Sequence, residues 1–160
     1  MHKWCKVKHI FPVETLNNFS VSFQVSVPFK YGIGVQPISL TFTEPAAGSI
    51  AVVSGWGVLA DGDETLPLQL QAVNVFIISR PECDYAYTAY HGITENMMCA
   101  GVPGGGHGAC FYDSGGPLVV DGQLVGIVSW GSGCGDARYP AVYSNVANLR
   151  SFVTEQTGVQ

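Results

Sequence analysis

The sequence predicts an all-β fold in a single domain over residues 1–160. Twenty glycines and nine prolines, with only 12% charged residues, are typical of proteins built from many short strands and tight turns. Short apolar runs separated by Gly, Pro and Asp residues are the second indication. With 47% hydrophobic residues, a chain of 160 residues can bury one core of ordinary size.

The expected strands follow one another along most of the chain. Residues 19–27 alternate apolar and polar side chains, which is the period of a half-buried strand. Bounded apolar runs predict further strands at residues 49–56, 68–78, 117–120, 123–129 and 141–144. Turn residues separate these runs, and no internal repeat or low-complexity tract interrupts them.

A turn and a closing helix are also expected. Asp121-Gly122 lies between two apolar runs and predicts a two-residue hairpin turn. The residues 146–157 carry apolar side chains at helical spacing, namely Val146, Leu149, Phe152 and Val153. The sequence therefore predicts that the chain closes with a helix that ends before Gly158.

The composition excludes several classes of function. A formal net charge of −5 leaves no basic patch for nucleic acid, and no apolar stretch is long enough to span a membrane. No charged segment followed by an apolar one begins at Met1, so no signal peptide is expected. No Cys-x-x-Cys or Cys/His pair has the spacing of metal ligands, and the sequence predicts neither a metal nor a cofactor.

The chemistry of the chain centres on the run from Cys110 to Val119. Ser114 stands between Asp113 and a Gly-Gly-Pro turn, directly before an apolar strand. Glycines permit a sharp turn of the backbone, so the serine hydroxyl can project from a tight loop as a nucleophile. Taken alone, these residues are equally compatible with an ordinary Gly/Pro turn.

The motif Asp113-Ser114-Gly115-Gly116-Pro117 is similar to the signature of the trypsin/chymotrypsin family of serine proteases. Further segments resemble motifs of the same family in the same order, at residues 54–57 (Ser-Gly-Trp-Gly), 96–101, 126–134, 140–143 and 145–146. The resemblance extends continuously from about residue 30 to the C-terminus.

The resemblance implies an architecture. Enzymes of this family place the active site between two antiparallel β-barrels. The second barrel supplies the serine and the substrate pocket, and the first supplies the catalytic histidine and aspartate. Residues 40–160 are expected to form a complete second barrel of six strands with its C-terminal helix. Residues 1–35 are expected to be only a remnant of the first barrel.

The partners of Ser114 are missing from the sequence. The family's Ala-Ala-His-Cys motif does not occur, and none of the histidines is convincing as a general base, namely His2, His9, His91 and His107. The slot of the catalytic aspartate holds Asn18 or Phe19, depending on a shift of one residue. Neither side chain can stabilise a charged imidazole as a carboxylate does.

The resemblance also assigns the substrate pocket. The oxyanion hole would be formed by the backbone N–H groups of Tyr112 and Ser114, although the family has glycine at the position of Tyr112. Tyr112 is expected either to strain the loop or turn its N–H away, or to be tolerated with its ring toward solvent. The resemblance places Gly108 at the base of the pocket and the other pocket residues around its walls and entrance, namely Ser129, Trp130, Gly131 and Ala141.

A pocket with an uncharged residue at its bottom favours an apolar substrate side chain. Gly108 offers no charge, so a basic side chain would be desolvated there without a partner. Asp136 lies in a neighbouring loop, and the sequence leaves open whether it reaches inward.

The five cysteines indicate an oxidising compartment. The resemblance implies the pairs Cys83–Cys99 and Cys110–Cys134, and it places the protein outside the cell. Cys5 is left over, either as a free thiol or as a residue whose partner lies in a segment that this chain lacks.

These features predict a serine endopeptidase that forms an acyl-enzyme on Ser114 and prefers apolar residues, but is inactive as this truncated chain. The alternative is a non-catalytic protease homologue that binds peptides or proteins, and a third account is an incomplete gene model of a normal enzyme. The expected partner is a peptide or protein substrate, with no nucleic acid and no membrane. Self-association is expected through the uncovered barrel interface, where an alternating strand would lack neighbours, namely Phe19, Val21, Phe23, Val25 and Val27.

Overall fold

The computed structural model describes residues 7–12 and 21–158, with side chains from residue 25 onward. Its strands are β1 (Val7–Pro12), β2 (Val21–Val25), β3 (Ser39–Leu40), β4 (Ile50–Gly55), β5 (Gln71–Ile78), β6 (Met97–Gly101), β7 (Pro117–Val120), β8 (Gln123–Trp130) and β9 (Ala141–Asn145). Its helices are α1 (Arg80–Ala86), the short 3-10 helix η1 (Thr88–Tyr90) and α2 (Val146–Thr157). Neither α-helix of the described residues is long and apolar enough to cross a bilayer.

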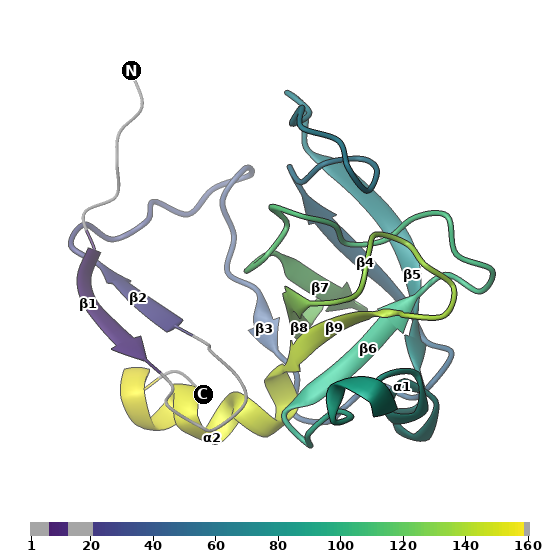
Figure 1. Ribbon diagram of the computed structural model, residues 1–160. Helices are drawn as coiled ribbons and strands as arrows, with labels where there is room; N and C mark the ends of the chain where they lie inside the picture. The colour runs from purple at the N-terminus through teal and green to yellow at the C-terminus, as the bar shows by residue number, and fades with distance from the viewer. Residues whose placement is uncertain (1–6, 13–20, 159–160) are drawn as a thin grey trace.

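Strands β4 to β9 form a closed antiparallel barrel (Figure 1). The sheet order is β3-β8-β7-β4-β5-β6-β9, and the additional pairing of β8 with β9 closes the barrel. The short strand β3 joins β8 in parallel, with Ser39 opposite Gln123. The predicted fold, a six-stranded barrel with a C-terminal helix, is confirmed.

A separate antiparallel pair lies outside the barrel (Figure 1). Here β1 and β2 form a two-stranded sheet in which Pro12 is opposite Val21. The predicted strand over residues 19–27 is shorter in the structure, because β2 ends at Val25 and residues 19 and 20 lie outside the described residues.

Several predicted boundaries are close to the observed ones, and the misses have physical causes. The predicted strand at residues 68–78 begins only at Gln71, since Leu68 follows a proline and is fully exposed. Strand β6 was not predicted because nearly all of its side chains are buried, which removes the alternation that marks a strand. Helix α1 was not predicted because its seven residues, which include Pro81, are too few to show the periodic spacing of a helix.

The turn and the closing helix match their predictions. Asp121 and Gly122 both adopt positive φ, 48° and 74°, as a type I′ hairpin turn requires. Helix α2 spans the predicted residues and ends at Gly158, which has a φ of 71°. Asn145 caps its start by accepting a hydrogen bond from the N–H of Ala147 over 3.1 Å.

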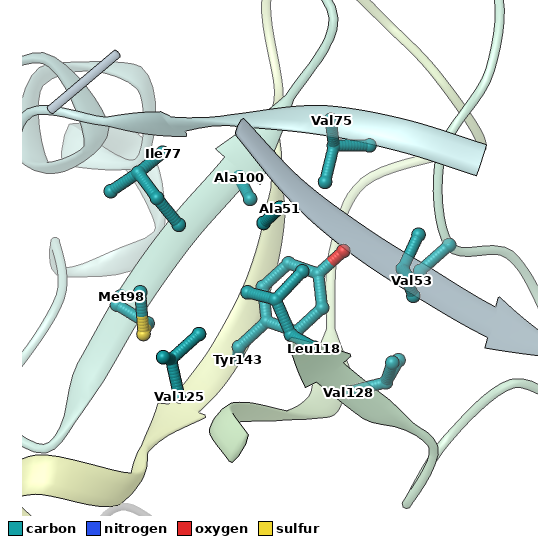
Figure 2. Close-up of a cluster of buried hydrophobic side chains, with 11 residues drawn as sticks. Ala51, Val53, Val75, Ile77, Met98, Ala100, Leu118, Val125, Val128 and Tyr143 are labelled. Atoms are coloured by element: carbon teal, nitrogen blue, oxygen red, sulfur yellow. The ribbon is translucent and has the colours of Figure 1, made fainter. Parts of the chain in front are cut away.

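The barrel is filled by apolar side chains from all of its strands (Figure 2). The buried cluster comprises Ala51, Val53, Val75, Ile77, Met98, Ala100, Ala109, Leu118, Val125, Val128 and Tyr143. Burial of each large aliphatic side chain contributes about 1.5–3 kcal/mol to folding. Gly126 admits this packing, because a Cβ at that position would lie 3.1 Å from atoms of both Leu118 and Tyr143.

A smaller cluster fastens α1 to the outside of the barrel. Its buried members are Cys83, Tyr87, Met97, Cys99 and Val142. The Cys83–Cys99 disulfide links α1 to β6, and Tyr87 lies one residue beyond the end of α1. This attachment places Tyr87 next to the strands that form the candidate site.

Candidate active site

The loop that carries Ser114 is fixed to strand β8 by backbone hydrogen bonds. The N–H of Gly115 donates to the carbonyl of Val128 over 2.8 Å, and the N–H of Val128 donates to Gly116 over 2.9 Å. Gly115 has a φ of 84°, a conformation that favours glycine. The side chain of Ser114 is exposed at this turn, as a nucleophile must be.

Asp113 joins this loop to the loop that follows β4. Its carboxylate accepts the N–H of Gly57 over 2.7 Å and the N–H of Cys110 over 3.0 Å. A Cβ added at Gly55 would lie 2.1 Å from a carboxylate oxygen of Asp113, and one at Gly57 would lie 2.5 Å from its carboxyl carbon. The glycines of the Ser54–Gly57 motif are therefore required by the position of the Asp113 side chain.

Ser114 lies at the edge of a hollow of about 260 Å³, which we call the Ser114 hollow. The structure brings together Ser114 and most of the predicted pocket residues as its lining, namely Ser129, Trp130, Gly131 and Ala141. The remaining lining residues are Ala109, Cys110, Phe111, Val128, Gly133 and Cys134. Gly108, the predicted base, does not line the Ser114 hollow but lines two neighbouring hollows, and Ala109 takes its place.

Among the residues whose side chains the structure describes, no charged one lines the Ser114 hollow. Asp136, whose reach the sequence left open, lines a neighbouring hollow, where Arg138 pairs with it over 2.7 Å. The hydrogen bond from the Arg138 side chain lowers the pKa of Asp136 to about 2. The wall of the Ser114 hollow is therefore suited to an apolar side chain.

Tyr112 combines two features that the sequence presented as alternatives. Its φ is 72°, so it keeps the left-handed backbone that favours glycine, and its side chain is 74% exposed. Among the backbone hydrogen bonds of the described residues, none is donated by the N–H of Tyr112 or of Ser114. The loop thus leaves the two donors that the sequence analysis assigned to an oxyanion hole unpaired.

No histidine lines the Ser114 hollow among the residues with described side chains. His107 lines the neighbouring hollows, and His91 is exposed at the end of η1. The side chain of His9 is not described, and His2, Asn18 and Phe19 lie outside the described residues.

Both predicted disulfides are present. Cys83 is bonded to Cys99, and Cys110 is bonded to Cys134. The second bond joins the start of the Ser114 loop to the loop after β8, so it ties two walls of the Ser114 hollow together. Cys5, the predicted unpaired cysteine, lies outside the described residues.

Tyr87 is a site residue that the sequence analysis missed. Its ring is fully buried and packs edge-on against Trp130, with ring centroids 4.7 Å apart. Its hydroxyl donates a hydrogen bond of 2.7 Å to the carbonyl of Pro140, the residue before Ala141. Tyr87 therefore connects Trp130, which lines the Ser114 hollow, to the residue before Ala141, which lines it too. No local sequence pattern marks it, because its contacts with Trp130 and Pro140 lie more than forty residues away along the chain.

A family model described as Trypsin matches residues 5–153. The chain belongs to the trypsin family. It is 44% identical over 143 residues to trypsin beta of Drosophila erecta and 42% identical over 144 residues to trypsin alpha of Drosophila melanogaster. These matches cover 89% of this chain and 55% and 56% of the relatives, so the chain spans about half their length.

A solved structure supports the same assignment. Neuropsin, a serine protease expressed in the limbic system of mouse brain, superposes with a TM-score of 0.87 at 32% identity. The match covers 95% of this chain and 71% of neuropsin. The resemblance inferred from the Ser114 motif is thus confirmed, and relatives of this trypsin-family chain are serine endopeptidases.

The position of Tyr87 yields a prediction for this member of the trypsin family. In the Tyr87→Phe variant the Pro140 carbonyl loses its donor, so we expect a loss of about 1–2 kcal/mol in unfolding free energy and weaker binding of apolar peptides. Denaturant unfolding and peptide titration measure both effects. The matched control is Tyr90→Phe, because the Tyr90 hydroxyl meets only the exposed Ser132 hydroxyl at 3.3 Å and should matter little.

The same residue predicts a pH dependence. Burial raises the pKa of Tyr87 from 10.0 to about 12. The unfolded chain therefore ionises first, and the contribution of Tyr87 to stability should be constant below pH 10 and fall between pH 10 and 12. An alkaline loss of stability that is identical in the Tyr87→Phe variant would contradict this role.

Proposed function

We propose that this chain carries the nucleophile and the substrate pocket of a serine endopeptidase. The observation that supports this most strongly is the arrangement around Ser114. Its hydroxyl is exposed at the edge of an uncharged hollow, and two unpaired N–H groups belong to the same loop. A peptide whose apolar side chain enters the hollow would present its carbonyl to both groups.

The reaction would follow from this arrangement. The oxygen of Ser114 bonds to the peptide carbonyl carbon, and the carbonyl oxygen takes the negative charge beside the N–H groups of Tyr112 and Ser114. The C–N bond then breaks, the amine leaves with a proton, and water hydrolyses the acyl-enzyme. A base must accept the serine proton, and no histidine with a described side chain lines the hollow. We assign the base and its carboxylate partner to the first barrel of the family architecture.

The pocket would accept an apolar side chain. Ala109, Gly131 and Ala141 are small wall residues, and Trp130 adds an aromatic surface. We keep Gly108 as a pocket residue in the proposal, because it is next to Ala109 in the chain and a Cβ built on it would meet no atom within 4 Å. The substrate class is therefore peptides or proteins with large apolar residues.

A second candidate function is peptide binding without cleavage. It is favoured by the combination of a formed hollow with a serine that lacks a base among the described residues. For either function we propose an extracellular location, because paired cysteines persist in oxidising compartments.

We further propose that residues 40–160 form the barrel unit and that residues 1–35 are a remnant of the first barrel. Several large apolar side chains in this region and the segment after it are exposed, namely Val27, Phe29, Tyr31, Ile33, Val35 and Ile38. The side chains of Val21 and Phe23 are not described, and Phe19 lies outside the described residues. Exposed apolar surface of this kind recruits other chains, so we propose self-association through it.

Labelling with a fluorophosphonate probe tests the catalytic proposal. The chain alone should label no more than its Ser114→Ala variant and should hydrolyse apolar-residue peptides no faster, because a serine without a base is a weak nucleophile. Fusion to the first barrel of Drosophila melanogaster trypsin alpha should restore labelling at Ser114. Stoichiometric labelling of the chain alone would reveal an unrecognised base, and a folded fusion that does not label would contradict the assignment of Ser114.

Removal of residues 1–35 tests the domain proposal. The full chain should associate in sedimentation experiments, whereas the trimmed chain should be more soluble and keep its barrel. Circular dichroism checks that the barrel is retained. If the full chain sediments as a compact monomer with protected amides over residues 19–27, these residues have another packing partner and the proposal is wrong.

A further inference from the structure

Tyr112 adopts an unusual backbone conformation next to the nucleophile. Its φ of 72° is disfavoured for a bulky side chain, because the Cβ crowds the backbone in the left-handed region. Glycine would relieve this conformation at no steric cost. Unfavourable conformations of this kind are retained mainly at functional sites, so we expect the side chain of Tyr112 to have a function.

The ring of Tyr112 is free to contact a ligand. It is 74% exposed, and among the described residues no hydrogen bond or ring contact holds it. The adjacent Phe111 is also exposed, at 57%, but it lines the Ser114 hollow, whereas Tyr112 does not. The two neighbouring rings therefore serve different regions of the same surface.

The path of a bound peptide indicates which of its residues each ring would contact. A peptide with one side chain in the hollow must place the following residue, the one that leaves after cleavage, outside the hollow and beyond Ser114. Tyr112 belongs to the Ser114 loop, and its N–H is one of the two unpaired donors. Its ring is exposed and does not line the hollow, so it is available to the part of a peptide that lies outside the hollow.

We propose that Tyr112 is a specificity residue whose ring packs against the leaving-group residue and favours an aromatic or large aliphatic side chain there. The neighbouring Asp113 carboxylate does not compete for this contact, since it is engaged by the N–H groups of Gly57 and Cys110. Aromatic rings contribute through apolar contact and ring stacking, which rewards a large apolar partner. The inference rests on the proposed function, because it requires a peptide in the Ser114 hollow.

Peptide binding to the full chain in the Ser114→Ala background tests the proposal. Three labelled peptides are compared by fluorescence anisotropy: one that ends at a phenylalanine for the hollow, and two that continue past it with either phenylalanine or alanine. The phenylalanine continuation should bind roughly two- to tenfold more tightly than the alanine continuation, the range expected for one aromatic contact.

Variants distinguish the role of the Tyr112 ring from that of the Phe111 ring. Tyr112→Gly should abolish the difference between the two continuations, and Tyr112→Phe should preserve the difference. Phe111→Ala, the matched control, should weaken all three peptides. A preference for phenylalanine that survives in Tyr112→Gly would overturn the inference while leaving the proposed function intact. Failure of the short peptide to bind would overturn the proposed function and the inference with it.

Discussion

The carboxylate of Asp113 holds the two loops on which the candidate site depends. It accepts backbone N–H groups from Gly57, on the loop after β4, and from Cys110, at the start of the Ser114 loop. Hydrogen bonds to a charged acceptor contribute about 1.5–3 kcal/mol each, and these are partly buried. Positions 55 and 57 require glycine, because a Cβ at either position would overlap the Asp113 side chain. The turn that exposes Ser114 is thus tied to the loop that follows β4.

The remaining walls of the Ser114 hollow are held by covalent and aromatic contacts. The Cys110–Cys134 bond joins the Ser114 loop to the segment after β8, and the Cys83–Cys99 bond anchors the helix that presents Tyr87. Tyr87 then contacts the ring of Trp130 and the carbonyl of Pro140, and so links the ends of β8 and β9 beside the hollow. These constraints belong to a single barrel, so the shape of the Ser114 hollow is formed by this part of the chain. In the proposed function, proton transfer from Ser114 would require a base, and no histidine with a described side chain lines the hollow.

Much of the fold and of the site could be read from local sequence, and several of the failures share one cause. Asp121-Gly122 fixes a turn by its own backbone preference, and the Ser114 motif marks a tight turn that exposes the serine, so both turns were predicted. Strand β6 and Tyr87 were not, because their environment consists of residues distant in sequence. The exchange of Gly108 for Ala109 in the lining of the hollow shows the same limit. A motif gives the order of pocket residues, but which of them faces the hollow depends on how the loop packs.

Amide hydrogen exchange at Gly57 and Cys110 tests most directly whether Asp113 holds the site together. Both N–H groups bond to its carboxylate, although they belong to loops more than fifty residues apart. They should therefore be protected in the full chain and should exchange together and rapidly in an Asp113→Ala variant, while amides of the barrel core such as Val75 stay protected. Equal protection of Gly57 and Cys110 with and without the carboxylate would contradict the account.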